Sequence, residues 1–198
     1  MTSAASPPLV LASTSPYRRA LLERLGLPFT SVAPQVDEAP RPGERPAVTA
    51  LRLAEAKARA VAAAHPDALV IGSDQIAALG GEALGKPRNP AHALEQLRSM
   101  RGRTIVFHTA IALLNARSGR CQTALVDVAS TFRSLDDDAL QAYLDREQPF
   151  DCAGSVKAEA LGIALFTRIA SDDPTALIGL PLIRLTDMLL AEGVSPLP

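Results

Sequence analysis

The chain has 198 residues, of which 47% are hydrophobic, and a formal net charge of −1 at pH 7. This length is sufficient for a sizeable core, in one domain or in two small lobes, and the charge offers no basic surplus for binding nucleic acid. The two cysteines, Cys121 and Cys152, form no disulfide framework or metal-ligand spacing. The sequence has no signal-peptide pattern, and no apolar stretch approaches the roughly 18 residues of a membrane span, so we expect a cytoplasmic protein without membrane partners.

Strands and helices alternate in the first half of the chain, and hairpins follow in the second half. Residues 1–7 are small and polar and are expected to be disordered, ahead of a single α/β domain over residues 8–198. Hydrophobic periodicity and turn residues predict, in chain order, strand 9–12, helix 16–25, strand 28–33, helix 47–64, strand 69–71, hairpin 75–86, helix 90–100, strands 104–115 and 121–133, helix 136–146, strand 162–169 and helix 181–192. This order predicts an α/β fold with a mixed sheet flanked by helices, in two lobes around a cleft.

The end of the first predicted strand carries a group of donors for an anion. Ser13 and Ser15 follow the apolar run, Pro16 begins the helix with Ser15 as its predicted N-cap, and Arg18 and Arg19 lie in the first turn. Free N–H groups at a helix start, hydroxyls and guanidinium groups together make a good receptor for phosphate. The alternative is an ordinary capped helix with solvated arginines.

A carboxylate is predicted at the end of another strand. The apolar run 69–71 is expected to stop at the string GSDQ, which would present Asp74 at the strand terminus, where catalytic acids are often placed. A turn aspartate without chemistry is the alternative. The hairpin that follows turns at residues 80–81 and ends at the string GKP, where Lys86 supplies a point charge.

The candidates for chemistry are polar side chains at element ends or in loops: Ser13, Ser15, Arg18, Arg19, Glu38, Lys57, Asp74, Gln75, Lys86, Lys157 and Glu159. Basic groups can neutralise phosphate while carboxylates hold a hard divalent cation, and Asp74 could orient or deprotonate an attacking water. The sequence supports neither a Ser-His-Asp triad nor a P-loop. The residues alone therefore indicate metal-assisted cleavage of a phosphorylated small molecule.

Seven short strings, in this order and spacing, resemble the Maf family of nucleoside triphosphate pyrophosphatases: LASTSPYRRALLERLG, VDE, RLAEAKA, IGSDQ, GKP, AGS and GLPL. The resemblance extends from about residue 9 to residue 192. It implies a strongly twisted sheet around a cleft, similar to the inosine triphosphatase fold. It also implies hydrolysis of a nucleoside triphosphate to the monophosphate and diphosphate, with a divalent cation, Mg²⁺ or Mn²⁺.

The resemblance further implies roles for individual residues. Asp74 is the proton acceptor, and Glu38 and Lys57 are further catalytic positions in the cleft. The divalent cation is assigned to Glu38 and Asp74. The triphosphate is assigned to Ser13, Ser15, Arg18, Arg19 and Lys86.

Three positions point to one branch of the family. Tyr17, Gln75 and Glu159 resemble the 7-methyl-GTP pyrophosphatase branch rather than the branch that acts on dTTP and UTP. A methylated guanine is a delocalised cation that an aromatic face attracts, and a carboxylate can accept hydrogen bonds from its N1–H and its exocyclic amine. The alternative is that Tyr17 packs on its helix and Glu159 is solvated.

Other functions remain open at this point. They are a dTTP or UTP pyrophosphatase of the same family, a non-catalytic nucleotide-binding regulator of septum formation, and a general phosphomonoesterase. The intact set of Asp74, Glu38, Lys57 and Lys86 argues against a pure regulator, which needs no water-activating carboxylate. The expected partner is a nucleotide, with no nucleic acid, and a homodimer is kept open.

Overall fold

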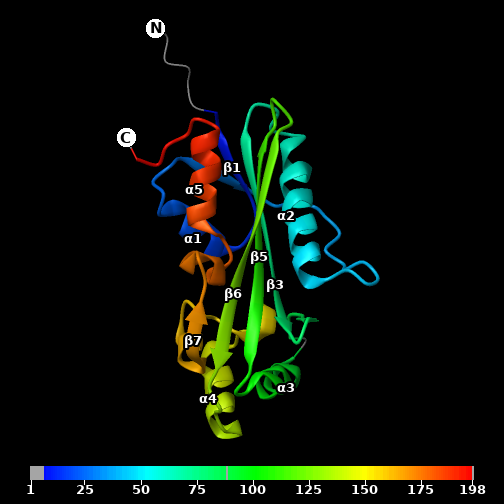
Figure 1. Cartoon of the computed structure of the whole chain (residues 1–198), viewed down its shortest axis with the longest axis vertical. Coiled ribbons are helices and arrows are strands. Elements are labelled where there is room, and N and C mark those ends of the chain that lie inside the picture. The colour runs from blue at the N-terminus through cyan, green and yellow to red at the C-terminus, as the bar shows by residue number, and fades with distance from the viewer. Residues whose placement is uncertain (1–6, 88, 198) are drawn as a thin grey trace.

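The computed structural model describes residues 7–87 and 89–197, and within them one mixed sheet of seven strands is flanked by five α-helices (Figure 1). In chain order these elements are β1 (Leu9–Ala12), α1 (Pro16–Glu23), β2 (Phe29–Val32), α2 (Pro46–Ala62), β3 (Leu69–Leu79), β4 (Glu82–Leu84), α3 (Pro90–Met100), β5 (Thr104–Asn115), β6 (Cys121–Phe132), α4 (Asp137–Glu147), β7 (Phe166–Ala170) and α5 (Leu182–Ala191). Three short 3₁₀ helices complete the described part of the chain: η1 (Ala153–Ser155), η2 (Leu161–Leu165) and η3 (Pro174–Ile178).

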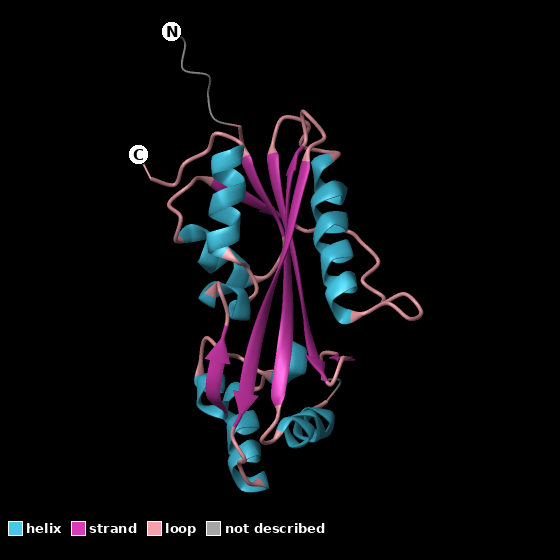
Figure 2. Cartoon of the chain, in the orientation of Figure 1, coloured by secondary structure: helices cyan, strands magenta, loops and turns pink. Residues whose placement is uncertain are grey.

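The strand order is β2-β1-β3-β5-β6-β7, with β4 paired to the far end of β3. β1 runs parallel to both β2 and β3, and the remaining pairs are antiparallel. Figure 2 shows the long strands crossing one another as the sheet twists. The predicted α/β fold with a mixed, strongly twisted sheet is therefore confirmed.

The two crossover helices cover opposite faces of the parallel strands. α1 packs with α5 on the face that carries Leu11 and Ile71, whereas α2 packs on the face that carries Val10 and Val70. In Figure 1 these helices stand to the left and to the right of the strands. α1 leads from β1 to β2 on one side, and the chain after β3 continues to β5 on the other side. The carboxyl end of β1, beside β3, is therefore a topological switch point, the usual place for a ligand in such sheets.

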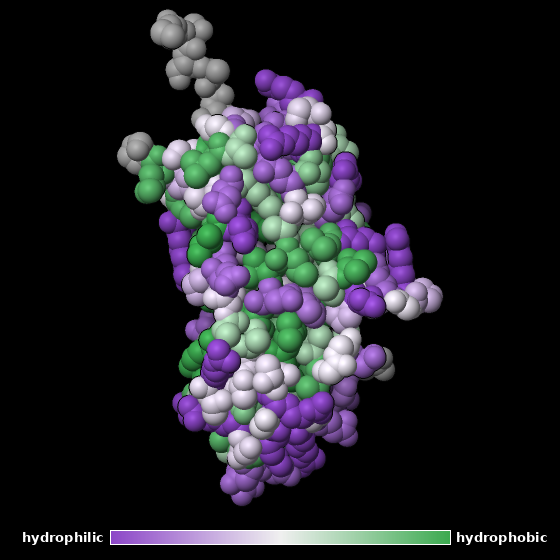
Figure 3. Space-filling model, viewed as in Figure 1, coloured by the Kyte–Doolittle hydropathy of each residue, from purple (hydrophilic) through white to green (hydrophobic). Residues whose placement is uncertain are grey.

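A second group of elements packs around the other end of the long strands. α3, α4, η1, η2 and β7 enclose a core that includes Ile105, Phe107 and Val128. Figure 1 shows this group below the first, which gives the molecule its two-lobed outline. On the face seen in Figure 3, hydrophobic residues gather at mid-height and the lower tip is mostly hydrophilic, as expected where only one side of α4 is buried.

Helix α2 approaches β3 very closely at Gly72. A Cβ atom at this position would lie 2.0 Å from the Ala54 carbonyl oxygen and 2.8 Å from the Ala58 backbone nitrogen. Only glycine leaves room for the helix here. The close approach brings Lys57 on α2 within reach of Asp74 on β3.

Two of the predicted element boundaries are wrong. The strand expected to end at residue 71 continues to Leu79, because its residues pair with β5 from Leu69 to Ala78. Tertiary pairing thus overrides the turn propensity of Gly, Ser and Asp. The strand expected from residue 162 begins only at Phe166, since η2 occupies residues 161–165.

The remaining helices and strands lie within a few residues of their predicted places. The predicted disorder at residues 1–7 falls almost wholly outside the described residues, and the single domain over residues 8–198 stays a prediction. Among the described helices, none is both long enough and apolar enough to cross a membrane.

Candidate active site

The edge of the sheet is open beside the middle of β3. β1 pairs with residues 69–72 of this strand and β4 pairs with residues 77–79 on the same edge. Among the described strands, none pairs with residues 73–76 on that side. The chain leaves β1 at this opening, so the start of α1 and the middle of β3 come together at the switch point.

Lys57 joins the two predicted carboxylates. Its Nζ atom lies 2.7 Å from Asp74 Oδ1 and 2.8 Å from Glu38 Oε1. The Lys57 side chain is only 6% exposed, whereas that of Glu38 is 57% exposed. A buried ammonium group needs such partners, because an unpaired charge in the interior is very costly. Asp74 lies within β3, which continues to Leu79, so the prediction that Asp74 ends a strand is wrong.

Two cations lie within electrostatic range of these carboxylates. Desolvation acts to raise the pKa of Glu38, but the hydrogen bond and charge of Lys57, followed by the charges of Lys86 and Arg18, hold it below its ordinary value. Lys86 itself is exposed. The structure thus places the two carboxylates of Glu38 and Asp74 within electrostatic range of the cations Arg18 and Lys86, from four separate segments of the chain.

A hydrogen bond to a backbone carbonyl orients the Arg18 side chain. Its Nε donates to the Gly179 oxygen at 2.9 Å, and Ser73 Oγ donates to the same oxygen at 2.9 Å. Burial lowers the pKa of Arg18, while the charges of Asp74 and Glu38 act to raise it. A guanidinium with so high an ordinary pKa remains charged and can bind phosphate.

The serines of the first loop organise the start of α1. Ser13 Oγ accepts from the Ser15 N–H at 3.1 Å, and Ser15 Oγ accepts from the Arg18 N–H at 3.4 Å, so the predicted N-cap is confirmed. Arg19 is exposed, and its Nε pairs with Glu23 at 3.1 Å. The structure therefore does not bring Arg19 to the other candidates, and it matches the alternative of a solvated arginine.

Tyr17 and Glu159 share one neighbourhood. Burial, then the charges of Cys152, Asp151 and Glu159, raise the pKa of the Tyr17 phenol. Glu159 is an exposed residue overall. Partial burial of its carboxyl and the charges of Glu147 and Asp151 raise its pKa, whereas a backbone hydrogen bond and the charge of Lys157 act to lower it. Tyr17 and Glu159 thus lie within electrostatic range of each other.

Gln75 lies on the opposite face of β3 from Asp74, since successive strand residues alternate. Its Nε2 is within 2.9 Å of Thr109 Oγ1 and of the Ala176 carbonyl, and 3.0 Å from the Leu177 carbonyl. This amide is occupied in holding η3. Lys157 is likewise occupied, because its Nζ donates to the Glu147 carbonyl at 2.7 Å.

Sequence reasoning did not identify the groups that hold these side chains. The Gly179 oxygen belongs to the string GLPL, but a backbone carbonyl has no signature of its own. Asp173 is 1% exposed and accepts from the N–H groups of Thr175, Ile183 and Arg184, which fixes the turn from η3 into α5. An Asp directly before a Pro, here Asp173 and Pro174, is an N-cap signal that could have indicated it.

The donor set at Lys57 fits a hard divalent cation. Among the described residues, no group of three or more His, Cys, Asp or Glu side chains lies together. Glu38 and Asp74 supply two carboxylates at one point. Mg²⁺ in nucleotide enzymes is commonly held by one or two carboxylates, with substrate phosphates and water completing its shell.

Two open hollows of the described residues lie away from this site. One of about 290 Å³ lies between α4 and η2, beside Tyr143 and Leu161, and one of about 380 Å³ lies beside the end of α2, at Arg59 and Leu114. Neither is lined by a predicted site residue. The convergence of charged groups at the open sheet edge, rather than a cavity, identifies the candidate site.

Comparison with known proteins covers nearly the whole chain. The family model described as Maf-like protein matches residues 8–192. Proteins named 7-methyl-GTP pyrophosphatase from Aromatoleum aromaticum and Thiobacillus denitrificans are each 60% identical, over 94% and 97% of this chain and 96% of each relative. One of the same name from Ralstonia nicotianae is 61% identical over 92% of this chain and 94% of that relative. The chain therefore belongs to the Maf family, as the seven strings had indicated.

Proposed function

We propose that this chain is a nucleoside triphosphate pyrophosphatase that prefers 7-methyl-GTP and releases the monophosphate and diphosphate. The observation that carries the reaction is the pair of carboxylates at Lys57 with Arg18 and Lys86 in range. The preference for the 7-methylguanine nucleobase is supported by the relatives near 60% identity, which are named 7-methyl-GTP pyrophosphatase.

One set of residues binds the phosphates, and another activates the attacking water. Arg18, Lys86 and the start of α1 with its serine hydroxyls neutralise the triphosphate. Asp74 accepts the proton of the water that attacks the α-phosphorus, and the bond to the β-phosphate breaks as diphosphate leaves. Lys57 holds Asp74 in one position, because it donates to Oδ1 at 2.7 Å.

A divalent cation belongs to this proposal. Glu38 and Asp74 are the residues that would hold Mg²⁺ or Mn²⁺ beside the phosphates. When bound, such an ion neutralises phosphate charge and lowers the pKa of a coordinated water.

The base is assigned to the region around Tyr17 and Glu159. The aromatic face of Tyr17 suits a cationic methylguanine, and the Glu159 carboxylate suits two adjacent donors. Gln75 contributes to specificity by fixing η3, through its bonds to the Ala176 and Leu177 carbonyls.

A panel assay tests the proposal. Purified protein is incubated with 7-methyl-GTP, GTP, dTTP, UTP and ATP with Mg²⁺ or Mn²⁺, and products are identified by chromatography and ³¹P NMR. We expect diphosphate and monophosphate, with the highest kcat/KM for 7-methyl-GTP. Preference for dTTP or UTP would move the chain to the other branch. Orthophosphate alone would indicate a phosphomonoesterase, and no hydrolysis of any nucleotide would leave only a binding protein.

The proposal places the protein in the cytoplasm, where free nucleotides are found, with the nucleotide as its partner. A homodimer is part of the same proposal. Size-exclusion chromatography with light scattering measures it, and a mass near the 20.8 kDa of one chain would exclude a stable dimer.

A further inference from the structure

A buried amide connects two loops that carry site residues. Gln96 on α3 is 6% exposed, and its Nε2 donates to the Gly85 carbonyl at 2.9 Å. Its Oε1 accepts from Ser155 Oγ at 2.6 Å. Gly85 immediately precedes Lys86, and Ser155 lies in η1, four residues before Glu159. We call these two bonds the Gln96 bridge.

The bridge ends on a residue in a strained conformation. Ser155 has φ of +60°, directly after Gly154 with φ of +66°. Residues other than glycine rarely adopt this left-handed region, and they persist in it only where their surroundings hold them. Ser155 is fully buried, and Gly154 donates from its N–H to the same Gly85 carbonyl at 3.4 Å.

A second side chain holds Ser155 from the backbone. Tyr143 donates from its hydroxyl to the Ser155 carbonyl at 3.2 Å and accepts from the Lys157 N–H at 3.0 Å. The loop that leads to Glu159 is thus fastened by two side chains, Gln96 and Tyr143. The Gln96 bridge also reaches the Lys86 segment, where it reinforces the longer bond from the Gly154 N–H to the Gly85 carbonyl. It links the predicted base end of the site to the predicted phosphate end.

We infer that Gln96 and Ser155 are positioning residues that set base selectivity by fixing the loop of Glu159 against the segment of Lys86. Both side chains are buried, so neither can touch a nucleotide, and their effect must pass through the loops they join. This inference rests on the proposed function, since it assigns a reason for the preference for 7-methyl-GTP.

The test compares kcat/KM for 7-methyl-GTP and dTTP in the full-length wild type, Gln96→Met and Ser155→Ala. Met has nearly the shape of Gln without its hydrogen bonds, and Ala removes only the Ser155 hydroxyl. Each variant should lower the ratio of 7-methyl-GTP to dTTP about tenfold, the usual scale of one hydrogen bond. The loss should appear in KM for 7-methyl-GTP, with kcat for dTTP little changed. The double variant should lose no more than either single one, because both break the same bridge.

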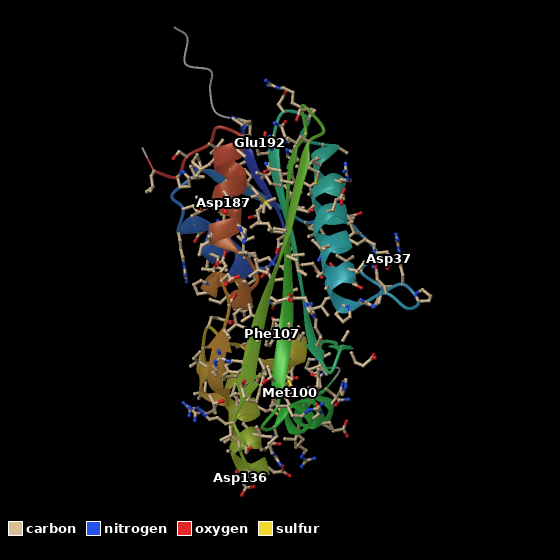
Figure 4. The ribbon with its side chains drawn as sticks, viewed as in Figure 1. Asp37, Met100, Phe107, Asp136, Asp187 and Glu192 are labelled. Atoms are coloured by element: carbon tan, nitrogen blue, oxygen red, sulfur yellow. The ribbon has the colours of Figure 1, made fainter. Side chains whose placement is uncertain are left out.

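Two matched controls use the same substitutions elsewhere. Gln122→Met removes a partly buried amide that bonds the Met188 carbonyl at 3.2 Å and Glu192 at 3.0 Å. Figure 4 shows Glu192 at the opposite end of the molecule from Met100 on α3. Ser130→Ala removes a buried hydroxyl that has no hydrogen-bond partner among the described residues. Both controls should keep the wild-type ratio.

A second measurement separates positioning from simple loss of stability. In a Glu159→Gln background, Gln96→Met should leave the selectivity ratio unchanged, since the group it positions has already been altered. A merely structural role would lower the activity on both nucleotides alike and would add to the effect of Glu159→Gln.

The outcomes are distinct. Wild-type protein without preference for 7-methyl-GTP overturns the proposed function and this inference with it. A wild type that prefers 7-methyl-GTP, with a ratio unmoved in folded Ser155→Ala, overturns this inference alone. If Gln96→Met does not fold, as judged by circular dichroism, Ser155→Ala decides.

Discussion

A single ammonium group holds the two carboxylates of the site. Lys57 Nζ lies within 2.8 Å of both Asp74 and Glu38, and it is the least exposed of the three side chains. Without it, two negative groups would face each other in a partly dry environment without a compensating charge, which is costly. Lys57 therefore compensates their charge through Asp74 Oδ1 and leaves the second oxygen of that carboxylate outside the ion pair.

Asp74→Asn is predicted to lower kcat by roughly 10²–10⁴-fold, the range for loss of a general base. The amide can still accept from Lys57, so the fold and the affinity for a non-hydrolysable nucleotide should be retained. Steady-state kinetics and calorimetry measure the two effects. Asp127→Asn is the control, because Asp127 is an exposed strand carboxylate paired only with His108 at 2.7 Å among the contacts described. Near-wild-type turnover in Asp74→Asn would remove it from the mechanism.

Acid is predicted to abolish selectivity before it abolishes turnover. The pKa of Glu159 is raised, chiefly by burial, so its carboxylate is lost first as pH falls. The pKa of Glu38 is lowered by Lys57 against the effect of desolvation, so its charge is present above that pKa and is lost only at lower pH. The ratio of kcat/KM for 7-methyl-GTP over dTTP should fall at higher pH than kcat for dTTP.

Rate profiles between roughly pH 4 and 6, the ordinary carboxylate range, test this order. Glu159→Gln is the control, in which the ratio should be low and independent of pH. A ratio in the wild type that follows kcat throughout would show that Glu159 does not recognise the base.

At the scale of elements, α2 organises the carboxylates from both sides. It presents Lys57, and it anchors the loop that carries Glu38. Arg52 on α2 binds Glu44 through two bonds of 2.6 and 2.7 Å and also donates to the Ala39 carbonyl at 3.1 Å. The hydrogen bond from Arg52 is the main cause that lowers the pKa of Glu44 to about 2, so the anchor persists in moderate acid.

Arg52→Lys is predicted to act like a weaker form of Glu38→Gln. Lysine keeps the charge but cannot make the two-pronged bond, so the residue after Glu38 loses its tie to α2. We expect a several-fold loss of kcat/KM for every nucleotide and a higher Mg²⁺ requirement. In a Glu38→Gln background the substitution should have no further effect, which a double-mutant cycle measures.

Arg59→Lys provides the control on the same helix. Arg59 pairs with Glu55 one turn away, and both are exposed, so little should change. Additive losses for Arg52→Lys and Glu38→Gln would show that Arg52 acts elsewhere.

At the scale of the whole molecule, the fold could be predicted further than the site. The amphipathic pattern of α2 and the alternation of β5 and β6 were sufficient for those elements, because each leaves a periodic signal. The predicted strand was shorter than β3 because the string GSDQ favours a turn locally. The pairing with β5, which continues β3 beyond this string, is visible only in the structure. The site strings contained Glu38, Lys57 and Asp74, which meet, but also Arg19, which lies apart. Their supports, such as the Gln96 amide and the Gly179 oxygen, come from distant segments with no periodicity, so they required the structure.

Gly72→Ala is predicted to destabilise the protein and to weaken catalysis together. The added carbon would lie 2.0 Å from the Ala54 oxygen, so α2 must move away from β3 and carry Lys57 with it. Overpacking of this kind costs about 1–3 kcal/mol or more, which chemical denaturation measures. Gly85→Ala serves as the control for stability, because no heavy atom lies within 4 Å of its added carbon. Unchanged stability in Gly72→Ala would show that the helix adjusts freely.

The oxygen of Gly179 receives both Arg18 and Ser73, at 2.9 Å each, and this has a consequence for how such sequences can vary. A main-chain oxygen is present whatever side chain its residue carries, so substitution cannot delete it. Inserting or deleting one residue between η3 and α5, however, would move it by several ångströms, since each residue adds up to about 3.3–3.6 Å of chain. In related chains, the number of residues in this turn should therefore be kept, together with glycine at position 179, whose φ of +115° other residues rarely adopt.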